Sequence, residues 1–369
     1  MQPEPEELEV VREEATAAVA AWDLEGDEWR VVGMVPGGLG SELRPVIAID
    51  AERYLVRRQP PDLREQDIQF RHDFMAHLRA EGLPVPYLRP RPSGSTYALV
   101  AGDFYELQEW REGVRYQAMA PEAPALSEAA AATLGMLHQA SALFEGETQV
   151  WPNERSPRSL AQSYVDLLTR TAERDDISPA VAAAVGRVAA SAAERVAAAA
   201  EALAVVPGPP ELHIHGDYQP RNLAFAPPSV TAIYDFDAVR WVRRLDELAY
   251  ALLCFTGIRD DGESAPTPLA DDGLDAARAH AFLWTYGRVA PPAEAEAALL
   301  GDAITLAFPV LVANGIVEDL VFADDFGGAP PAEAILPRLE WADAFWVWLD
   351  RYRGVLAEAW QTAAREPTP

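Results

Sequence analysis

Two short segments, HGDYQPRN (His215–Asn222) and IYDFD (Ile233–Asp237), carry most of the information in this chain. Asp217 and Asn222 lie five residues apart in the first segment, and Asp235 lies in the second. Transfer of a phosphoryl group needs a carboxylate beside the acceptor hydroxyl, and oxygen ligands that hold Mg²⁺ on the nucleotide phosphates. The residue types at these three positions meet that need.

The sequence between the two segments predicts a hairpin. Leu223–Phe225 and Val230–Tyr234 have strand composition, and Pro227–Ser229 supply the turn. Such a hairpin brings Asn222 and Asp235 to the same end of the strand pair. Mg²⁺ prefers hard oxygen ligands and keeps several waters, so these two side chains suffice as protein ligands. Asp217 is then the candidate catalytic base.

The combined pattern resembles the aminoglycoside phosphotransferase / choline kinase / homoserine kinase type II superfamily, from about Glu28 to the C-terminal helices. The resemblance implies an α+β, protein-kinase-like fold with two lobes. The small lobe has five strands and one helix, and the larger C-terminal lobe is mostly helical. It also implies ATP and Mg²⁺ as cofactors. The expected acceptor is a hydroxyl of a small molecule such as an amino alcohol, amino acid, sugar or aminoglycoside.

The length of 369 residues suits two lobes around a cleft. Residues 1–28 are expected to form an acidic helix packed on the small lobe, residues 29–110 the nucleotide-binding lobe, and residues 111–369 the catalytic lobe with its hairpin at 211–237. Periodicity and turn residues predict the elements of the small lobe. They are strands at 29–35, 43–49, 54–58, 96–100 and 104–110, and a helix at 62–80. Helices are expected at 127–144, 160–172, 179–206, 246–255, 273–286, 293–314 and 332–364.

Three further places are expected to bind the nucleotide. In the glycine-rich segment Gly37-Gly38-Leu39-Gly40-Ser41, glycines allow backbone amides to approach phosphate and Ser41 adds a hydroxyl. The resemblance places adenine against the backbone of Glu109 and Trp110, between the lobes. It also places a cation on the third strand, where this chain has Arg57.

The small lobe departs from the superfamily's pattern at two positions. A lysine on the third strand and a glutamate on the next helix usually form a pair. Here Arg57 stands at the lysine position and Arg71 at the glutamate position. Two arginines cannot pair, so either Asp67 or Glu65 takes the acidic role, or Arg71 itself reaches phosphate.

Four residues around the central motif have supporting roles that the sequence leaves open. His215 is expected to support the loop, and Arg221 to stabilise charge or remain an ordinary exposed arginine. Asp237 either binds a second metal or caps the following segment. Asp246 is assigned a structural role, although either Asp246 or Glu247 matches the acid that buttresses the catalytic loop in the superfamily. The acceptor pocket is expected to include Trp241, Asp260, Asp261, Trp284, Glu318 and Asp319.

Charge and composition exclude several classes of partner. Fifty-eight acidic and 30 basic side chains give a net charge of −28, which repels nucleic acid and anionic membranes. The field favours a cationic acceptor, although solubility alone also explains it. The single cysteine, Cys254, and an acidic N-terminus without an apolar signal core fit a reducing cytoplasm.

Two alternative functions share this fold. One is a Ser/Thr protein kinase of the bacterial stress-response type, but no segment resembles an activation loop or a peptide-docking groove. The other is a nucleotide-binding pseudokinase with a regulatory role, which the Arg57/Arg71 substitutions favour. The complete Asp217, Asn222 and Asp235 set favours a small-molecule kinase.

Overall fold

The computed structural model describes residues 5–24, 29–36, 43–61, 63–146, 156–206, 209–259, 267–320, 332–363 and 365. The chain divides into two compact units. The first unit comprises residues 1–113 and 231–234, and the second comprises residues 114–230 and 235–369. The sequence placed the boundary between lobes at residue 110 and did not assign residues 231–234 to the small lobe.

The first unit is built on a five-stranded antiparallel sheet with the strand order β1-β2-β3-β5-β4. Its strands are β1 (Trp29–Pro36), β2 (Leu43–Ile49), β3 (Glu52–Arg58), β4 (Ala98–Val100) and β5 (Asp103–Glu109). The register of β3 and β5 places Arg57 directly opposite Glu106 and Arg58 opposite Tyr105. Because of this register, Glu106 is the carboxylate that faces the buried Arg57.

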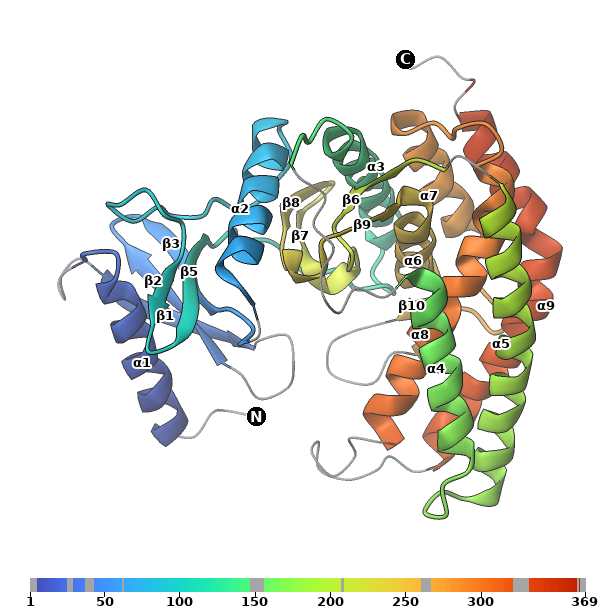
Figure 1. The fold of residues 1–369 in the computed structure, drawn as a ribbon. Helices are drawn as coiled ribbons and strands as arrows, with labels where there is room; N and C mark the ends of the chain where they lie inside the picture. Colours follow the sequence, from blue (N-terminus) through green and yellow to red (C-terminus); the bar gives the residue numbers. More distant parts are fainter. Residues whose placement is uncertain are drawn as a thin grey trace. The chain divides into compact units, whose positions relative to one another are not determined.

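One helix covers each face of this sheet (Figure 1). Helix α1 (Pro5–Ala20) buries Ala18 and Val19 against apolar side chains of β2, β3 and β5. Helix α2 (Glu65–Ala80) turns Ile68, Phe74 and other buried side chains inward on the opposite side. Because both faces are covered, β3 is buried over four successive residues instead of alternating between buried and exposed.

The predicted five strands and single helix of the small lobe are confirmed. The bounds of β2 agree with the prediction, and the other strands differ by one or two residues at an end. Helix α2 begins at Glu65, three residues after the predicted start, where Asp67 accepts a hydrogen bond from the backbone N–H of Arg64. An acceptor in the first turn satisfies a free backbone donor and fixes the start of the helix.

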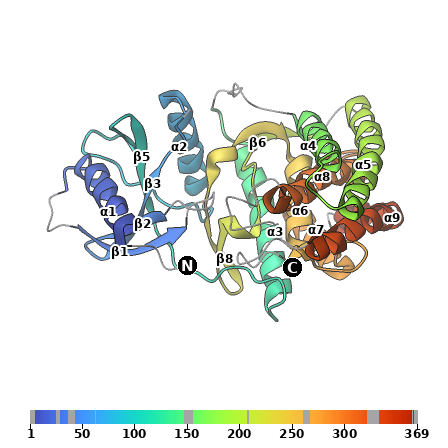
Figure 2. The same cartoon turned by 90° about the horizontal axis from the view of Figure 1, so that it is seen from below.

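The second unit is mostly helical. Its helices are α3 (Ala123–Ser141), α4 (Pro157–Ala172), α5 (Pro179–Val205), α6 (Arg244–Thr256), α7 (Ala276–Val289), α8 (Leu300–Leu320) and α9 (Ala332–Ala363), with short 3₁₀ turns η1 (Pro220–Asn222), η2 (Phe236–Ala238) and η3 (Ala297–Leu299). Helices α4, α5, α8 and α9 pack side by side (Figure 2). Helix α6 packs against α8, α7 and α3, and its residues Glu247 and Tyr250 contact residues 215–217. None of the described helices is both long and apolar enough to cross a bilayer.

Short strands in the second unit position the central motif. Strand β6 (Glu211–Ile214) pairs with β9 (Arg240–Arg243), and Ile214 lies opposite Arg240. The predicted hairpin is formed by β7 (Leu223–Ala226) and β8 (Ser229–Ile233). Strands β10 (Ile258–Arg259) and β11 (Thr267–Pro268) form a small separate pair. The sequence did not predict β9, β10 or β11, which are two to four residues long.

A buried ion pair attaches the start of α6 to the segment before α8. The guanidinium of Arg244 donates to both carboxylate oxygens of Glu296, at 2.9 and 2.6 Å, and lies over the ring of Trp360. Glu296 is fully buried and also accepts from the backbone N–H of Ala293 at 2.8 Å. Burial lowers the pKa of Arg244, but the hydrogen bonds to Glu296 and the electrostatic interactions with Tyr286 and Glu296 together outweigh burial and raise it overall.

Glu296→Ala should therefore lower the free energy of unfolding by ~3 kcal/mol, because it leaves a buried guanidinium without its counterion. Asp350→Ala is the matched control. It removes an equally well-formed pair with Arg195, but the Asp350 side chain is 54% exposed. A loss of at most ~1 kcal/mol is expected there. Denaturant unfolding followed by circular dichroism measures both, and equal losses would contradict the role given to Glu296.

Candidate active site

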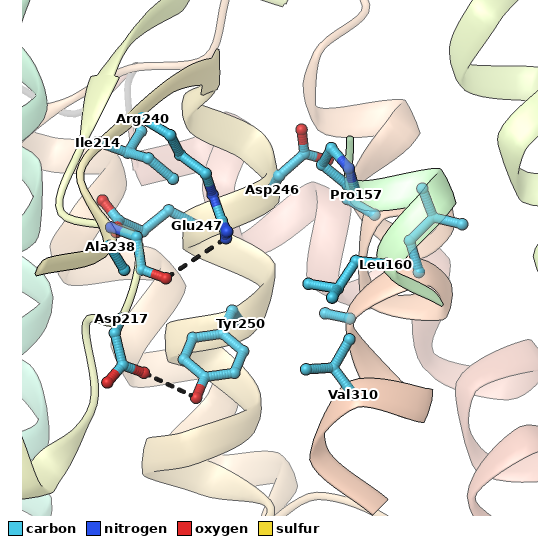
Figure 3. A pocket seen from close by; sticks show the side chains of 14 residues that line it. Pro157, Leu160, Ile214, Asp217, Ala238, Arg240, Asp246, Glu247, Tyr250 and Val310 are labelled. Carbon is cyan, nitrogen blue, oxygen red and sulfur yellow. Dashed lines mark hydrogen bonds between the residues drawn. The ribbon is translucent and has the colours of Figure 1, made fainter. Parts of the chain in front are cut away.

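The segment His215–Asn222, which carries the candidate base and is here called the catalytic segment, begins where β6 ends, and Gly216 determines its path. Gly216 has a φ of +86°, and a Cβ on it would lie 1.9 Å from the carbonyl oxygen of Ala238. Only glycine adopts this left-handed conformation without strain and also leaves room for the neighbouring backbone. The sharp turn directs Asp217 away from the buried strand and toward a pocket (Figure 3).

Glu247 on α6 holds this turn in place. Its carboxylate accepts hydrogen bonds from the backbone N–H groups of His215 (3.2 Å) and Gly216 (2.5 Å). The ring of His138 on α3 lies 3.0 Å from the same carboxylate. Burial raises the pKa of Glu247, but the contacts with His138 and the loop outweigh burial, so its pKa is lowered overall. Glu247 is thus the acid that buttresses the loop, which resolves the alternative that the sequence left open.

The Asp217 carboxylate accepts hydrogen bonds from three side chains. Gln219 donates to both oxygens at 2.8 and 2.9 Å, and Asn222 donates to Oδ2 at 2.8 Å. The hydroxyl of Tyr250 on α6 donates to Oδ1 at 3.0 Å. Burial, with further contributions from Cys254 and Asp217, raises the pKa of Tyr250 well above its usual value of 10, so this hydroxyl stays protonated. These donors fix the carboxylate at the floor of the pocket.

Asn222 and Asp235 lie at the open end of the β7–β8 hairpin, where β7 begins and β8 ends. Asn222 immediately precedes β7, and Asp235 follows β8 after one residue. The amide nitrogen of Asn222 donates to the backbone carbonyl and the side chain of Asp217, so its amide oxygen is directed elsewhere. Asp235 has a φ of +63°, an uncommon conformation for a residue with a side chain. No group of three or more His, Cys, Asp or Glu among the described residues is placed to hold a metal ion. Magnesium between protein and nucleotide phosphates needs only one or two carboxylates.

The four supporting residues have different surroundings. His215 is fully buried, lies 4.6 Å from the ring of Phe236 and accepts from the backbone N–H of Asp217. Asp246 binds Arg243 through two hydrogen bonds of 3.0 and 3.1 Å, in agreement with a structural role. Arg221 and Asp237 are both exposed, and Asp237 lies in η2, directly after the turn at Asp235.

A pocket of about 250 Å³ opens beside Asp217 within the second unit (Figure 3). Its polar side contains Asp217, Arg240, Asp246 and Tyr250. Its apolar side comes from the start of α4 and one face of α8: Pro157, Leu160, Ala303, Leu306, Ala307 and Val310. Most of the predicted acceptor residues do not fall here. Trp241 and Trp284 are not among the lining residues, Asp260 and Asp261 lie outside the described residues, and the side chains of Glu318 and Asp319 are not described.

In the first unit, Arg57 belongs to a buried polar network on the α2 side of the sheet. Arg57 lies 3.4 Å from Glu106, its partner across the strands, and its side chain is 6% exposed. Glu106 also accepts from Gln59 and lies 2.8 Å from the ring of His72. Arg71 donates to the amide oxygen of Gln59 at 2.5 Å. Burial raises the pKa of Glu106, but His72, Arg57 and Arg71 outweigh burial and lower it overall.

This network corrects the predicted partner of Arg57. The expected partner was Asp67 or Glu65 on α2. In the structure Asp67 forms a two-point ion pair with Arg64, and Glu65 accepts from the hydroxyl of Tyr97. Glu106 takes the acidic role because the β3–β5 register places it across from Arg57. Arg58, the next residue on β3, points to the other face of the sheet, and its side chain is 42% exposed. The glycine-rich segment 37–41 lies outside the described residues.

The backbone at Glu109 and Trp110 already makes hydrogen bonds within the first unit. The N–H of Glu109 donates to Tyr87 and the N–H of Trp110 to Arg53, at 2.7 and 2.8 Å. The next amide, that of Arg111, donates to the hydroxyl of Tyr234 at 3.0 Å. A nucleotide base that accepts a hydrogen bond from the backbone of residues 109–111 would therefore have to replace one of these partners. The hydroxyl of Tyr234 is the easiest of them to displace, because it belongs to a side chain.

The sequence analysis left Glu247 as an alternative to Asp246 and missed three residues: Tyr250 and Arg240 beside Asp217, and Glu106 beside Arg57. Tyr250 was not considered, although it lies three residues after Glu247 and hence on the same face of α6. Glu106 was not predicted as the partner of Arg57, because this contact depends on the register of β3 with β5. Arg240 was not predicted as a site residue, since β9, the strand that positions it, was not predicted.

Comparison with known proteins supports the same fold. The sequence profile of the phosphotransferase enzyme family (APH) matches residues 35–292. No curated protein matches the sequence. The chain is similar to the structure of the amicoumacin kinase hAmiN in complex with AMP-PNP, Ca²⁺ and Ami, with a TM-score of 0.62, 13% identity, and coverage of 91% of this chain and 93% of that one.

Two further solved structures are similar over nearly their whole length. An aminoglycoside phosphotransferase from Alicyclobacillus acidocaldarius has a TM-score of 0.61 and 17% identity, and 95% of this chain and 96% of that chain are covered. A choline kinase from Cryptosporidium parvum has a TM-score of 0.56 and 10% identity, with 96% and 98% covered. At these identities the likeness shows a shared fold, the two-lobed kinase-like fold that the sequence predicted. With the match over residues 35–292, the chain belongs to the phosphotransferase enzyme family (APH).

Proposed function

We propose that the protein is an ATP-dependent kinase that phosphorylates a hydroxyl group of a small molecule. The observation that carries the proposal is the position of Asp217, which three donors fix at the floor of a pocket of about 250 Å³. A pocket of that volume accommodates a small acceptor next to a candidate base. The family match supports phosphoryl transfer as the reaction class.

Asp217 would orient the acceptor hydroxyl and receive its proton late in the transfer. A raised pKa is not needed, because the transition state of phosphoryl transfer is loose and positioning contributes most. Three donors occupy both oxygens of Asp217, so the incoming hydroxyl exchanges with one of them. Tyr250 limits the rotation of the carboxylate, and Glu247 keeps the loop beneath it rigid.

Asn222 and Asp235 would hold Mg²⁺ at the end of the hairpin, and both offer the oxygen donors that this ion prefers. Mg²⁺ with ATP supplies the transferable phosphoryl group and neutralises its charge. We further propose that Arg57 contacts the nucleotide phosphates. Arg57 and Glu106 form a buried pair of a base and an acid, as the usual lysine and glutamate do. Here the acid lies on strand β5 instead of on a helix.

A regulatory pseudokinase is the second candidate, and the Arg57/Arg71 substitutions are the observation that favours it. In the structure Arg57 has an acidic partner and Arg71 is bound through Gln59, so the substitutions are accommodated in an organised network. This supports the catalytic alternative. Turnover across a panel of hydroxylated metabolites and aminoglycosides distinguishes the two candidates.

Asp217→Asn should reduce turnover by about 10²- to 10⁴-fold while the affinity for Mg-ATP stays the same, because an amide cannot accept the proton. The amide is close in shape to the carboxylate, so Gln219 and Tyr250 retain partners and the fold should persist. Asp176→Asn, at an exposed ion pair remote from the pocket, is the matched control. Nearly intact turnover in Asp217→Asn, measured by ATP consumption with the best acceptor, would exclude the base assignment.

Asp235→Ala should remove the magnesium-dependent part of nucleotide binding, because a carboxylate ligand is lost at the end of β8. The measurement is calorimetric titration with ATP, with and without Mg²⁺, on the variant and the parent protein. Without Mg²⁺ the two should bind ATP alike. An unchanged affinity for Mg-ATP in the variant would remove Asp235 from the metal site.

Arg57→Ala should weaken Mg-ATP binding by about tenfold or more, since charge-assisted hydrogen bonds contribute ~1.5–3 kcal/mol. Because Arg57 is buried against Glu106, the alanine variant is also expected to lose stability. Arg57→Lys separates the two effects, since it keeps the charge and part of the affinity. Arg58→Ala, on the exposed face of the same strand, is the control that should bind normally. If Arg57→Lys bound as the parent does and Arg57→Ala lost only stability, the arginine would be structural.

A further inference from the structure

The pocket beside Asp217 contains a cation whose hydrogen-bonding capacity the protein does not use. Among the described residues that line the pocket, Arg240 is the one basic side chain. Its Nη2 donates to the carbonyl of Gly216 at 3.4 Å, which is long for a hydrogen bond. Its Nε is buried and makes no hydrogen bond with the described part of the chain. A guanidinium has five donors in a planar fork, so its terminal nitrogens keep donors for a ligand.

The carboxylates around the pocket, in contrast, already have partners. Asp246 is bound by two nitrogens of Arg243. Glu247 receives two backbone N–H groups and the ring of His138. Asp217 is held by three side chains and is reserved for the reacting hydroxyl under the proposed function. The polar side of the pocket therefore offers a ligand one cation and no unengaged anion among the described lining residues.

The position of Arg240 restricts the ligand further. Arg240 lies on β9 opposite Ile214, and its guanidinium extends into the pocket as far as the carbonyl of Gly216, the residue before Asp217 (Figure 3). The group it binds and the hydroxyl that faces Asp217 must therefore be separated by only a few atoms. Across from both, Leu160, Leu306 and the other side chains of α4 and α8 form an apolar wall.

We infer that the acceptor is a small hydroxy acid whose carboxylate is bound by Arg240 and whose hydrocarbon part lies on the apolar wall. The inference rests on the proposed function, and it identifies the class of acceptor for the same site. A carboxylate matches the planar fork of a guanidinium through two parallel hydrogen bonds. A phosphate group fits less well, because its second negative charge would face both Asp217 and Asp246.

This local chemistry differs from the expectation of a cationic acceptor that follows from the net charge of −28. At physiological ionic strength exposed charges are screened beyond roughly 8 Å, so distant surface carboxylates contribute little inside the pocket. A direct contact with a guanidinium in a small, partly apolar pocket is not screened in this way. Arg240 is therefore the lining group that favours an anionic group on the acceptor.

Four probes of one chain length test the inference: 4-hydroxybutanoate, 4-hydroxybutanamide, butane-1,4-diol and 4-aminobutan-1-ol. They share the hydroxyl and a four-carbon chain and differ only at the other end of that chain. Calorimetry in the presence of Mg-ADP measures their affinities for the full chain. The acid should bind at least about tenfold more tightly than the diol, and the amino alcohol should bind most weakly.

Arg240→Gln should reduce the affinity for the acid by about tenfold and leave the affinity for the diol and for Mg-ATP unchanged. Arg195→Gln removes the same charge at an exposed ion pair outside the pocket and should leave all four affinities unchanged. If the acid binds no more tightly than the diol or the amino alcohol, or if Arg240→Gln leaves their order intact, the inference is wrong. A fall in Mg-ATP affinity would assign Arg240 to the nucleotide instead.

Phosphoryl transfer from ATP to the same four probes separates this inference from the proposed function. Transfer to the amino alcohol in preference to the acid would leave the kinase assignment standing and overturn the inference. Preferential binding of the acid without transfer to any hydroxylated compound would overturn the kinase assignment and leave the anion site standing.

Discussion

The carboxylate of Glu247 is the contact on which the catalytic segment depends. It joins α6 to the backbone of His215 and Gly216 and to His138 on α3. Because its pKa is lowered in the fold, its contribution to stability is complete above the ordinary carboxyl pKa and is lost as the pH falls through the lowered value. Asp217 can be placed accurately only because the two residues before it are held in this way.

Glu247 also determines what the rest of α6 does. Tyr250 and Cys254 follow it at intervals of three and four residues, so all three side chains share one face of the helix. Glu247 holds the backbone of the loop, and Tyr250 holds the carboxylate of Asp217. One helix thus sets both the backbone and the side-chain conformation of the candidate base, and a shift of α6 would alter both together.

The sequence predicted the elements that local patterns determine. The hairpin after Asn222, the five strands and most helices depend on spacing, glycine and proline positions and apolar periodicity, and they are found as expected. The partners of Arg57 and Asp217 could not be predicted in this way, because the register of β3 with β5 and the packing of α6 under the loop bring them together. A strand of four residues such as β9 is too short for its pattern to distinguish it from a loop, and Arg240 was overlooked for that reason.

The assignment of residues 231–234 to the first unit has a consequence for how this protein can be divided. The chain passes from one unit to the other three times, at residues 113, 230 and 234. Ile233 donates a backbone hydrogen bond to Pro84, and Tyr234 binds the backbone of Arg111, so this short segment has its partners in the N-terminal part of the chain. No single cut yields two complete pieces. A fragment ending at residue 113 lacks these four residues. The complementary fragment keeps their pairing with β7 but lacks Pro84 and Arg111, so both units are complete only in one polypeptide.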